Sequence, residues 1–356
     1  MRSYSLTHAA HLAQRALFGG AQPLEAVSTD RIVLHQAEEI ISPPAIYLES
    51  ELEKIQSFHP ETTRETEERR IRGGVHRHAA TVAYRLENVR LRDAGFYKGR
   101  WSMYFPRIDL KDNDKPAITS KAVCALSSSY CGVQYFGHWL RDDATTRLVA
   151  ETFGEPLAIR APDWPHRAFY ASAFGQDWTP TDAADIETLF VIRDVGQNSH
   201  KIARYQELRR RIRRAVTPKY TGHGVYLARG DSGIHKRIIR NEPEVIDFLI
   251  RRGFHILDVT RDPIEEIAAT MLDAKLFVSI EGSQQSHALY LLGAPAGYVA
   301  IQMPTMVNNI WNDFAAQISC RYGFVIGAAR DDGVEVDIPA LDKTIDMIAD
   351  DIACPK

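Results

Sequence analysis

The feature that most constrains the fold is a regular alternation of strands and helices in the C-terminal part of the chain. Stretches with helical spacing separate short apolar runs, which are typical of buried parallel strands. Thr217 and Pro218 end the long helix before this region. We therefore predict a Rossmann-like half over residues 218–356. Its strands are GVYLAR at 224–229, FHILDV at 254–259, KLFVSI at 275–280 and GYVAIQM at 297–303.

Helix ends in this half can also be predicted. Asn241 stands three residues before Glu244, and Asp262-Pro263 precedes Glu265, so each pair offers an N-cap oxygen and an N3 carboxylate. Gly253 suits the position just after a helix. The pattern predicts capped helices on both sides of the strand at 254–259.

The first half, residues 1–217, is predicted to carry a small β element before its own α/β layer. Residues 61–74 are highly charged and predict a solvated helix or a mobile segment. Residues 81–105 alternate like an antiparallel meander. The helix at 201–216 has many arginines, and a solvated linker helix is favoured over a membrane or polyanion contact. The last helix, 338–353, has an apolar face that could fold back on the first domain.

Composition limits the classes of function. The net charge is -3, from 43 basic and 46 acidic residues, so nucleic-acid binding is disfavoured. The four cysteines are scattered and are expected to be reduced thiols. The start lacks an apolar leader, and no apolar run is long enough to span a membrane. We expect a cytoplasmic protein, and peripheral association with the inner face of the membrane stays open.

The first segment with chemical potential follows the strand at 224–229. Arg229 ends this strand, and the next loop carries Lys236 and Arg237. Ligands of open α/β sheets bind at the carboxyl ends of strands, and the arginine fork matches phosphate oxygens. Arg229 and Arg237 are therefore candidates for binding a diphosphate, and surface salt bridging is the alternative.

The second segment follows the strand at 275–280. Gly282 permits close backbone approach before a helix whose free N–H groups favour phosphate, and Ser283 and Ser286 add hydroxyls. Glu281 would repel a diphosphate, so it is expected to accept from ribose hydroxyls or to act as a base. The alternative is that Glu281 only supports the start of the helix.

The third segment places His138, Trp139, Asp142 and Asp143 around a predicted helix start. His138 and Asp142 are four residues apart and share a helical face. Either one is a candidate base for removing a proton from a hydroxyl group. Taken alone, this segment favours packing and helix-dipole roles for these residues.

No metal and no cofactor are expected. Asp112-Asn113-Asp114 fits the DxD expression, but lysines flank it in a hydrophilic stretch and would oppose a cation. The histidines show no ligand spacing. No GxGxxG follows a strand, and Walker A and GxSxG motifs are absent, which disfavours dinucleotide, P-loop and serine-hydrolase chemistry.

Together the three segments resemble glycosyltransferase family 61, in particular its bacterial capsular polysaccharide biosynthesis type. The resemblance covers about residues 88–327 and rests on an ordered set of motifs. One departure is clear, because many members have an H-G-A segment where this chain has Glu281-Gly282-Ser283 and His287. The matching residues are Gly137-His138-Trp139-Leu140 with Asp142, then Arg229, Arg237, Asn241-Glu242 and Gly253-Phe254.

The resemblance implies an α/β fold of the GT-B type, with two Rossmann-like domains facing a cleft. It implies an inverting, metal-independent glycosyltransferase that moves a sugar from a UDP-linked or related donor to a surface glycan. Asp142 and His138 would act on the acceptor in domain 1–217, and domain 218–356 would bind the donor. A non-catalytic nucleotide- or carbohydrate-binding relative is the alternative. The implied donor-binding residues are Arg229, Arg237, Asn241, Glu242, Glu281, Gly282, Ser283, Ser286 and His287.

Overall fold

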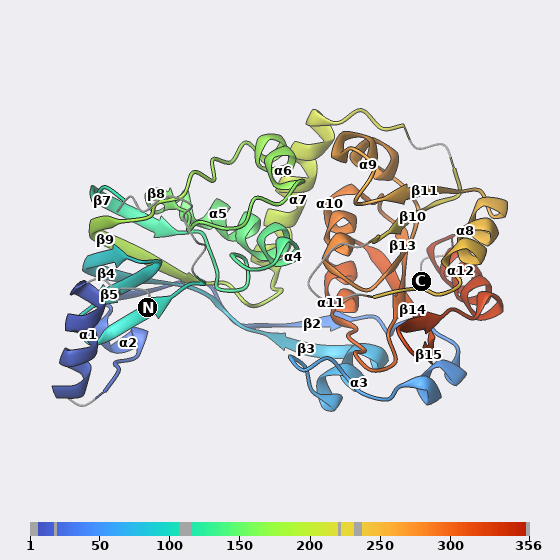
Figure 1. Cartoon of the computed structure of the whole chain (residues 1–356), viewed down its shortest axis with the longest axis horizontal. Coiled ribbons are helices and arrows are strands. Elements are labelled where there is room, and N and C mark those ends of the chain that lie inside the picture. Colours follow the sequence, from blue (N-terminus) through green and yellow to red (C-terminus); the bar gives the residue numbers. More distant parts are fainter. Residues whose placement is uncertain (1–5, 18–19, 107–115, 220–221, 231–236, 354–356) are drawn as a thin grey trace. The chain divides into compact units, whose positions relative to one another are not determined.

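The computed structural model describes residues 6–17, 20–106, 116–219, 222–230 and 237–353 (Figure 1). Contacts divide the chain into two compact units. Unit 1 consists of residues 1–38 and 79–204, and unit 2 of residues 39–78 and 205–356. The segment 39–78 thus belongs to the same unit as the C-terminal half. The predicted roles of the two halves, acceptor-side and donor-side, stay predictions.

Unit 2 contains a five-stranded parallel sheet in the order β11-β10-β12-β13-β14. The first two strands of this sheet in chain order, β10 and β11, are neighbours. The later strands, β12, β13 and β14, continue on the other side of β10. Tyr226 of β10 lies opposite Val278 of β12. This order reverses direction between β10 and β12, as in doubly wound sheets. The strands are β10 (Gly224–Ala228), β11 (Phe254–Asp258), β12 (Leu276–Ile280), β13 (Ala296–Gln302) and β14 (Cys320–Ile326).

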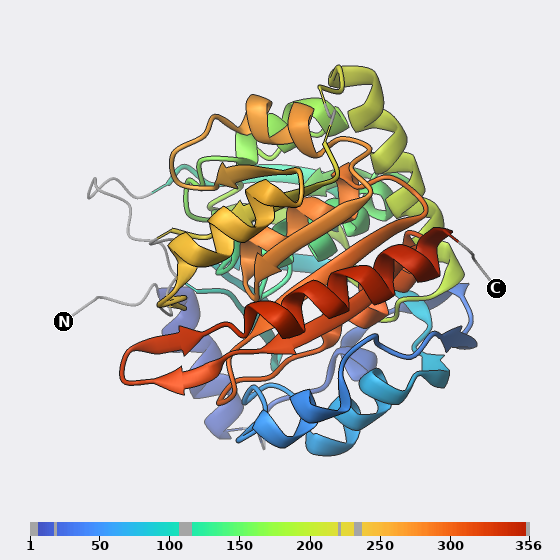
Figure 2. The ribbon, with the colours of Figure 1, turned by 90° about the vertical axis from the view of Figure 1, so that its right-hand side faces the viewer.

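Helices cover both faces of this sheet. Figure 1 shows α10 and α11 on one side and α8 and α12 on the other, and Figure 2 shows α12 lying along its face. Leu341, Ile345 and Ile348 of α12 join the core under this face. This packing within unit 2 accounts for the apolar face of the last helix. The helices are α8 (Glu242–Arg251), α9 (Ile264–Met271), η3 (Ser283–His287), α10 (Ala288–Leu291), α11 (Ile310–Gln317) and α12 (Ile338–Ala353).

The segment 39–78 is anchored in unit 2 by buried carboxylates. Glu51 is fully buried and accepts from Ile326 N at 2.6 Å. Glu67 is equally buried and accepts from Asn309 N at 2.6 Å. The helix predicted in the charged stretch exists, but it packs on the unit and is not simply solvated. The elements are β2 (Glu38–Ser42), η1 (Glu49–Lys54), α3 (Arg64–Arg72) and β3 (Gly74–His78), with β15 (Ala328–Arg330) and β16 (Gly333–Glu335) near the end of the chain.

Unit 1 contains a seven-stranded mixed sheet in the order β6-β5-β4-β9-β7-β8, with β1 also paired to β4. The predicted meander is confirmed, since β4, β5 and β6 pair antiparallel. It is not a separate element, because β4 also pairs with β9. The strands are β1 (Asp30–His35), β4 (Thr81–Arg92), β5 (Gly95–Lys98), β6 (Trp101–Tyr104), β7 (Thr119–Leu126), β8 (Glu155–Leu157) and β9 (Ala184–Arg193).

Apart from α1 and α2, which precede β1, the helices of unit 1 follow its parallel strands β7, β8 and β9. One long helical stretch comes after β7, and α7 comes after β9 and crosses into unit 2 at Tyr205. These two strands are parallel neighbours, so the segments after them start from the same edge of the sheet. The helices are α1 (Leu6–Leu17), α2 (Leu24–Val27), α4 (Phe136–His138), η2 (Trp139–Asp143), α5 (Ala144–Ala150), α6 (Arg167–Phe174) and α7 (Ser199–Ala215).

Both predicted capping boxes are wrong. The Asn241 side chain makes no cap bond, because it pairs with the backbone of Val336 at 2.9 Å. Pro263 is the N-cap of α9, and Asp262 accepts from Asp258 N at 2.7 Å instead. The stop at Gly253 is confirmed by its φ of 78° after α8.

The α/β class is confirmed by these two sheets, whereas the GT-B arrangement stays a prediction.

Candidate functional site

Two predicted segments meet at the carboxyl ends of β10 and β12. Arg229 follows β10 directly, and Glu281 follows β12 directly. Arg229 Nη1 donates to the Glu281 carbonyl oxygen at 3.2 Å. Arg237 Nη2 forms an ion pair with Glu281 Oε2 at 2.7 Å. The structure therefore brings three predicted side chains together at the point where the strand order reverses, which is where doubly wound sheets bind ligands.

Gly282 is required by close approach. A Cβ atom at this position would overlap the guanidinium of Arg229 and the amide of Gln284. Gln284 Nε2 donates to Ile280 O at 2.6 Å, and Ser279 Oγ donates to Leu227 O at 2.7 Å. These bonds connect the ends of β10 and β12, so the turn that carries Glu281 is fixed to the strand that carries Arg229.

The charges at this edge are shielded from water. The Arg237 and Glu281 side chains are only 9% and 11% exposed. Burial lowers the pKa of Arg229 to about 10, and the neighbouring Arg237 adds to this effect while Glu281 opposes it. Arg229 therefore keeps its charge at neutral pH. Arg237 Nε is buried and has no hydrogen-bond partner among the described residues.

Asn241 and Glu242 have structural contacts in this structure. Asn241 binds both backbone groups of Val336, and Tyr226 OH donates to Glu242 Oε1 at 2.7 Å. Burial and this carboxylate raise the pKa of Tyr226. These bonds fix the end of the loop that carries Arg237. Direct donor contacts of the two residues stay a prediction.

The remaining predicted residues of this segment differ in exposure. Ser283 is exposed, whereas Ser286 and His287 are fully buried. A ligand contact of the last two would require this turn to open, and their donor contacts stay a prediction. Lys236 lies outside the described residues, as does the DxD stretch at 112–114.

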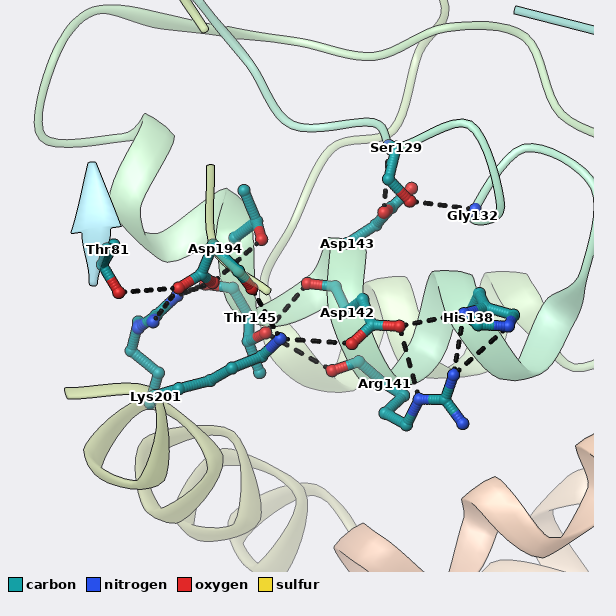
Figure 3. A network of polar contacts seen from close by, with 12 residues as sticks. Thr81, Ser129, Gly132, His138, Arg141, Asp142, Asp143, Thr145, Asp194 and Lys201 are labelled. Atoms are coloured by element: carbon teal, nitrogen blue, oxygen red, sulfur yellow. Dashed lines mark hydrogen bonds and ion pairs between the residues drawn. The ribbon is translucent and has the colours of Figure 1, made fainter. Parts of the chain in front are cut away.

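The third segment forms a separate polar network in unit 1 (Figure 3). His138 ends α4, and the π-helical turn η2 places Asp142 beside it. His138 Nδ1 lies 3.0 Å from Asp142 Oδ2. Both side chains are partly exposed, at 29% and 26%. A histidine paired with a carboxylate and open to solvent is an arrangement suited to general base catalysis.

Arg141 joins this pair. Its Nη2 lies 2.7 Å from His138 Nδ1 and 3.3 Å from Nε2, and its Nε donates to Asp142 Oδ2 at 3.3 Å. His138 Nδ1 donates to the carboxylate when it is protonated and accepts from Arg141 when it is not. The proton on Nδ1 therefore decides which neighbour orients the ring.

Two residues that the sequence did not indicate complete the network. Lys201 of α7 donates to Asp142 Oδ1 at 3.1 Å and to the Asp194 carbonyl oxygen at 3.0 Å. Burial acts to raise the pKa of Asp142, but the charges of Arg141 and Lys201 outweigh it and hold that pKa well below its usual value. Asp142 is therefore an anion at neutral pH. A lysine inside an arginine-rich helix gives no sequence signal of such burial.

Asp143 differs from its neighbour. Ser129 N donates to its Oδ1 at 3.0 Å, and its Oδ2 has no hydrogen-bond partner among the described residues. Burial raises the pKa of Asp143 well above its usual value. A Cβ atom at Gly132 would overlap this carboxyl group, so the loop after β7 closes tightly on it. The pKa values of two adjacent carboxyl groups are thus shifted in opposite directions.

Across the described ranges, no group of three or more His, Cys, Asp or Glu side chains is arranged to hold a metal ion. No helix in that part of the chain has the length and apolarity needed to cross a membrane.

A comparison with protein families matches residues 136–301 to the family described as Glycosyltransferase 61. The matched region contains both polar clusters, from His138 to Gly282. The matched region is therefore that of a glycosyltransferase. It belongs to glycosyltransferase family 61, as the ordered motifs indicated. Comparison with curated proteins gives no match.

Proposed function

We propose that the chain transfers a sugar from a nucleotide-sugar donor, UDP-linked, to a glycan acceptor, and that the leaving diphosphate binds at the carboxyl ends of β10 and β12. The convergence of Arg229, Arg237 and the Gly282 turn at the reversal of strand order supports this most directly. Sheets of this type bind nucleotides at such a point.

The two arginines supply the charge that a leaving diphosphate needs. Preorganised cations in a water-excluded site stabilise negative charge that develops in the transition state. Arg237 pairs with Glu281, so a diphosphate would share or replace this partner. Glu281 then accepts from the ribose hydroxyls. In this proposal the arginines do the work of a divalent ion, and transfer continues in EDTA.

The acceptor is activated by His138. Its Nε2 removes the proton from the acceptor hydroxyl, the acceptor oxygen bonds to the anomeric carbon, and the bond from that carbon to the diphosphate oxygen breaks. Such a single displacement inverts the anomeric configuration. Asp142 is the weaker base because its pKa is depressed, but as an anion it accepts from Nδ1 and stabilises the protonated ring.

The finer assignments belong to the same proposal. The acceptor is a growing surface glycan, and the reaction takes place in the cytoplasm at the inner face of the membrane. Arrangement of the two units as in GT-B enzymes also remains part of the proposal.

The test is a panel of UDP-sugars, with donor hydrolysis and transfer to mixed oligosaccharide acceptors measured with and without EDTA. Arg237→Ala is expected to lower turnover at least about tenfold, as for other groups that stabilise transition-state charge. The exposed Arg214→Ala in α7 serves as the control and retains activity. Nucleotide binding without hydrolysis or transfer of any donor would contradict the proposal, and so would full activity of Arg237→Ala.

A further inference from the structure

The Lys201 side chain is fully buried, which is unusual for a lysine. Its ammonium group makes one contact with the candidate catalytic pair and one with the body of unit 1. The first is to Asp142 Oδ1 at 3.1 Å, and the second is to the Asp194 carbonyl oxygen at 3.0 Å. Figure 3 shows the side chain reaching from α7 to both groups.

The two oxygens of Asp142 have different partners. Oδ1 faces Lys201, and Oδ2 faces His138 Nδ1 at 3.0 Å and Arg141 Nε at 3.3 Å. A carboxylate that is bound at one oxygen cannot rotate without losing that bond. The position of Oδ2 relative to the His138 ring therefore depends on Lys201.

Lys201 is itself supported by a rigid frame. Arg204 binds both carboxylate oxygens of Asp194, at 2.6 and 2.8 Å. Thr81 and Thr146 donate to the same carboxylate at 3.0 and 3.1 Å. Asn198 Oδ1 accepts from Lys201 N at 3.0 Å. The Asp194 carbonyl oxygen, which accepts from the Lys201 ammonium group, thus belongs to a buried residue whose side chain is held by several hydrogen bonds.

The charges around Asp142 come from three segments. Its own helix contributes Arg141, His138 and Asp143, and the raised pKa of Asp143 makes that carboxyl group neutral well above the usual range. Helix α7 contributes Lys201, and Arg204 is already paired with Asp194 at the end of β9. Among the described residues, Lys201 and Arg141 are consequently the cations that lower the pKa of Asp142.

We propose that Lys201 is a positioning residue, which holds the Asp142 carboxylate through its Oδ1 atom. Oδ2 then stays aligned with His138 Nδ1, and the basic Nε2 of the ring is available to the acceptor. This inference rests on the proposed role of His138. The competing explanation is that Lys201 only stabilises the fold, as buried ion pairs sometimes do.

The two explanations differ in what they predict for the protons of the His138–Asp142 pair. Lys201→Met removes a positive charge beside the pair, so the pair should take up its proton at higher pH. Nearby charges shift such midpoints by about 1 pH unit or more. The charge of Lys201 alone would produce this shift, so the tautomer of the neutral His138 ring is measured as well from its ring nitrogen signals. The proposal predicts a proton on Nδ1 in wild type and loss of this preference in Lys201→Met, whereas a residue that only supports the fold leaves the tautomer unchanged.

The experiment is an NMR titration of the histidine ring signals, with the His138 signal identified by its loss in His138→Asn. Wild type, Lys201→Met and Lys201→Arg are compared. The arginine variant keeps the charge and should titrate as wild type does, while the methionine variant should shift upward by about 1 pH unit. Lys201→Gln, which keeps a donor, replaces the methionine variant if that protein does not fold.

Arg209→Met is the matched control, because it removes a buried cation on the same helix that contacts neither Asp142 nor Asp194. It should lower the melting temperature and leave the His138 midpoint in place. An unshifted midpoint in folded Lys201→Met or Lys201→Gln overturns the proposal. If the midpoint shifts but His138→Asn retains full transfer activity, the base role fails while the coupling through Lys201 stands.

Discussion

At the scale of single residues, the cluster of Arg229, Arg237 and Glu281 depends on the absence of a side chain at Gly282. The Arg229 guanidinium occupies the space that a Cβ atom would need. Neither group can move easily, because Arg229 is 5% exposed and Gln284 is bonded to the end of β12. The glycine is therefore needed for close approach at this turn.

Gly282→Ala should displace Arg229 and weaken nucleotide binding by about tenfold, because a charge-assisted phosphate contact contributes roughly 1.5 to 3 kcal/mol. Calorimetric titration with UDP measures this change. Gly175→Ala is the control for backbone strain alone, because Gly175 has a φ of 64° in a turn of unit 1 but a Cβ atom there meets no neighbour within 4 Å. Equal affinity for UDP in Gly282→Ala and wild type would show that Arg229 does not contact the ligand.

At the scale of elements, helix α7 does not only link consecutive segments of the chain but also packs through a buried arginine against α10. Arg209 is 4% exposed and donates to Leu289 O and Leu292 O, both at 2.6 Å. These carbonyls lie at the end of α10, where the helix dipole favours a cation. Burial lowers the pKa of Arg209 to about 10, so the charge persists at neutral pH. The expectation of a solvated linker helix is wrong for this face of α7.

Arg209→Met should lower the free energy of unfolding by about 3 kcal/mol, since it leaves two buried carbonyls without their charged donor. The exposed Arg210→Met on the same helix should change it by less than about 0.5 kcal/mol. Chemical denaturation of both variants measures the difference. Similar losses in both would mean that helix propensity, not the contact with α10, explains the effect.

The sequence predicts local periodicity well and long-range packing poorly. Strands β10, β11, β12 and β13 and the stop at Gly253 were predicted because each depends on a few adjacent residues, whereas β14 was not predicted. The caps at Asn241 and Asp262 were mispredicted because their side chains bond to Val336 and Asp258 instead. Lys201 was missed for the same reason, because its burial depends on Asp194 and Asp142 from other segments.

At the scale of the whole molecule, the free energy of unfolding should depend on pH through buried carboxyl groups whose pKa values are shifted in opposite directions. At Asp142 and Asp194, neighbouring cations outweigh the effect of burial and lower the pKa of each carboxyl group. Their contribution to the free energy of unfolding is therefore present above about pH 4, and it is lost as the pH falls through their pKa values in the folded protein. Asp143 has a raised pKa, so its contribution is present below about pH 4 and is lost as the pH rises.

Asp143→Asn removes only the loss of stability that Asp143 causes as the pH rises. Relative to wild type, the variant should gain stability progressively as the pH rises from about 4 to 7, because it has no buried acid to ionise. Urea denaturation across this range measures the gain, with the exposed Asp163→Asn as the control. A stability difference that does not vary with pH would show that Asp143 is not held neutral in the fold.

The proposed transfer requires a diphosphate held by Arg229 and Arg237 at the ends of β10 and β12. Its most direct test is calorimetric titration of UDP into wild type, Arg237→Ala and the exposed Arg214→Ala. We predict that wild type and Arg214→Ala bind alike and that Arg237→Ala binds at least about tenfold more weakly. Equal UDP affinity in all three proteins would contradict the assignment.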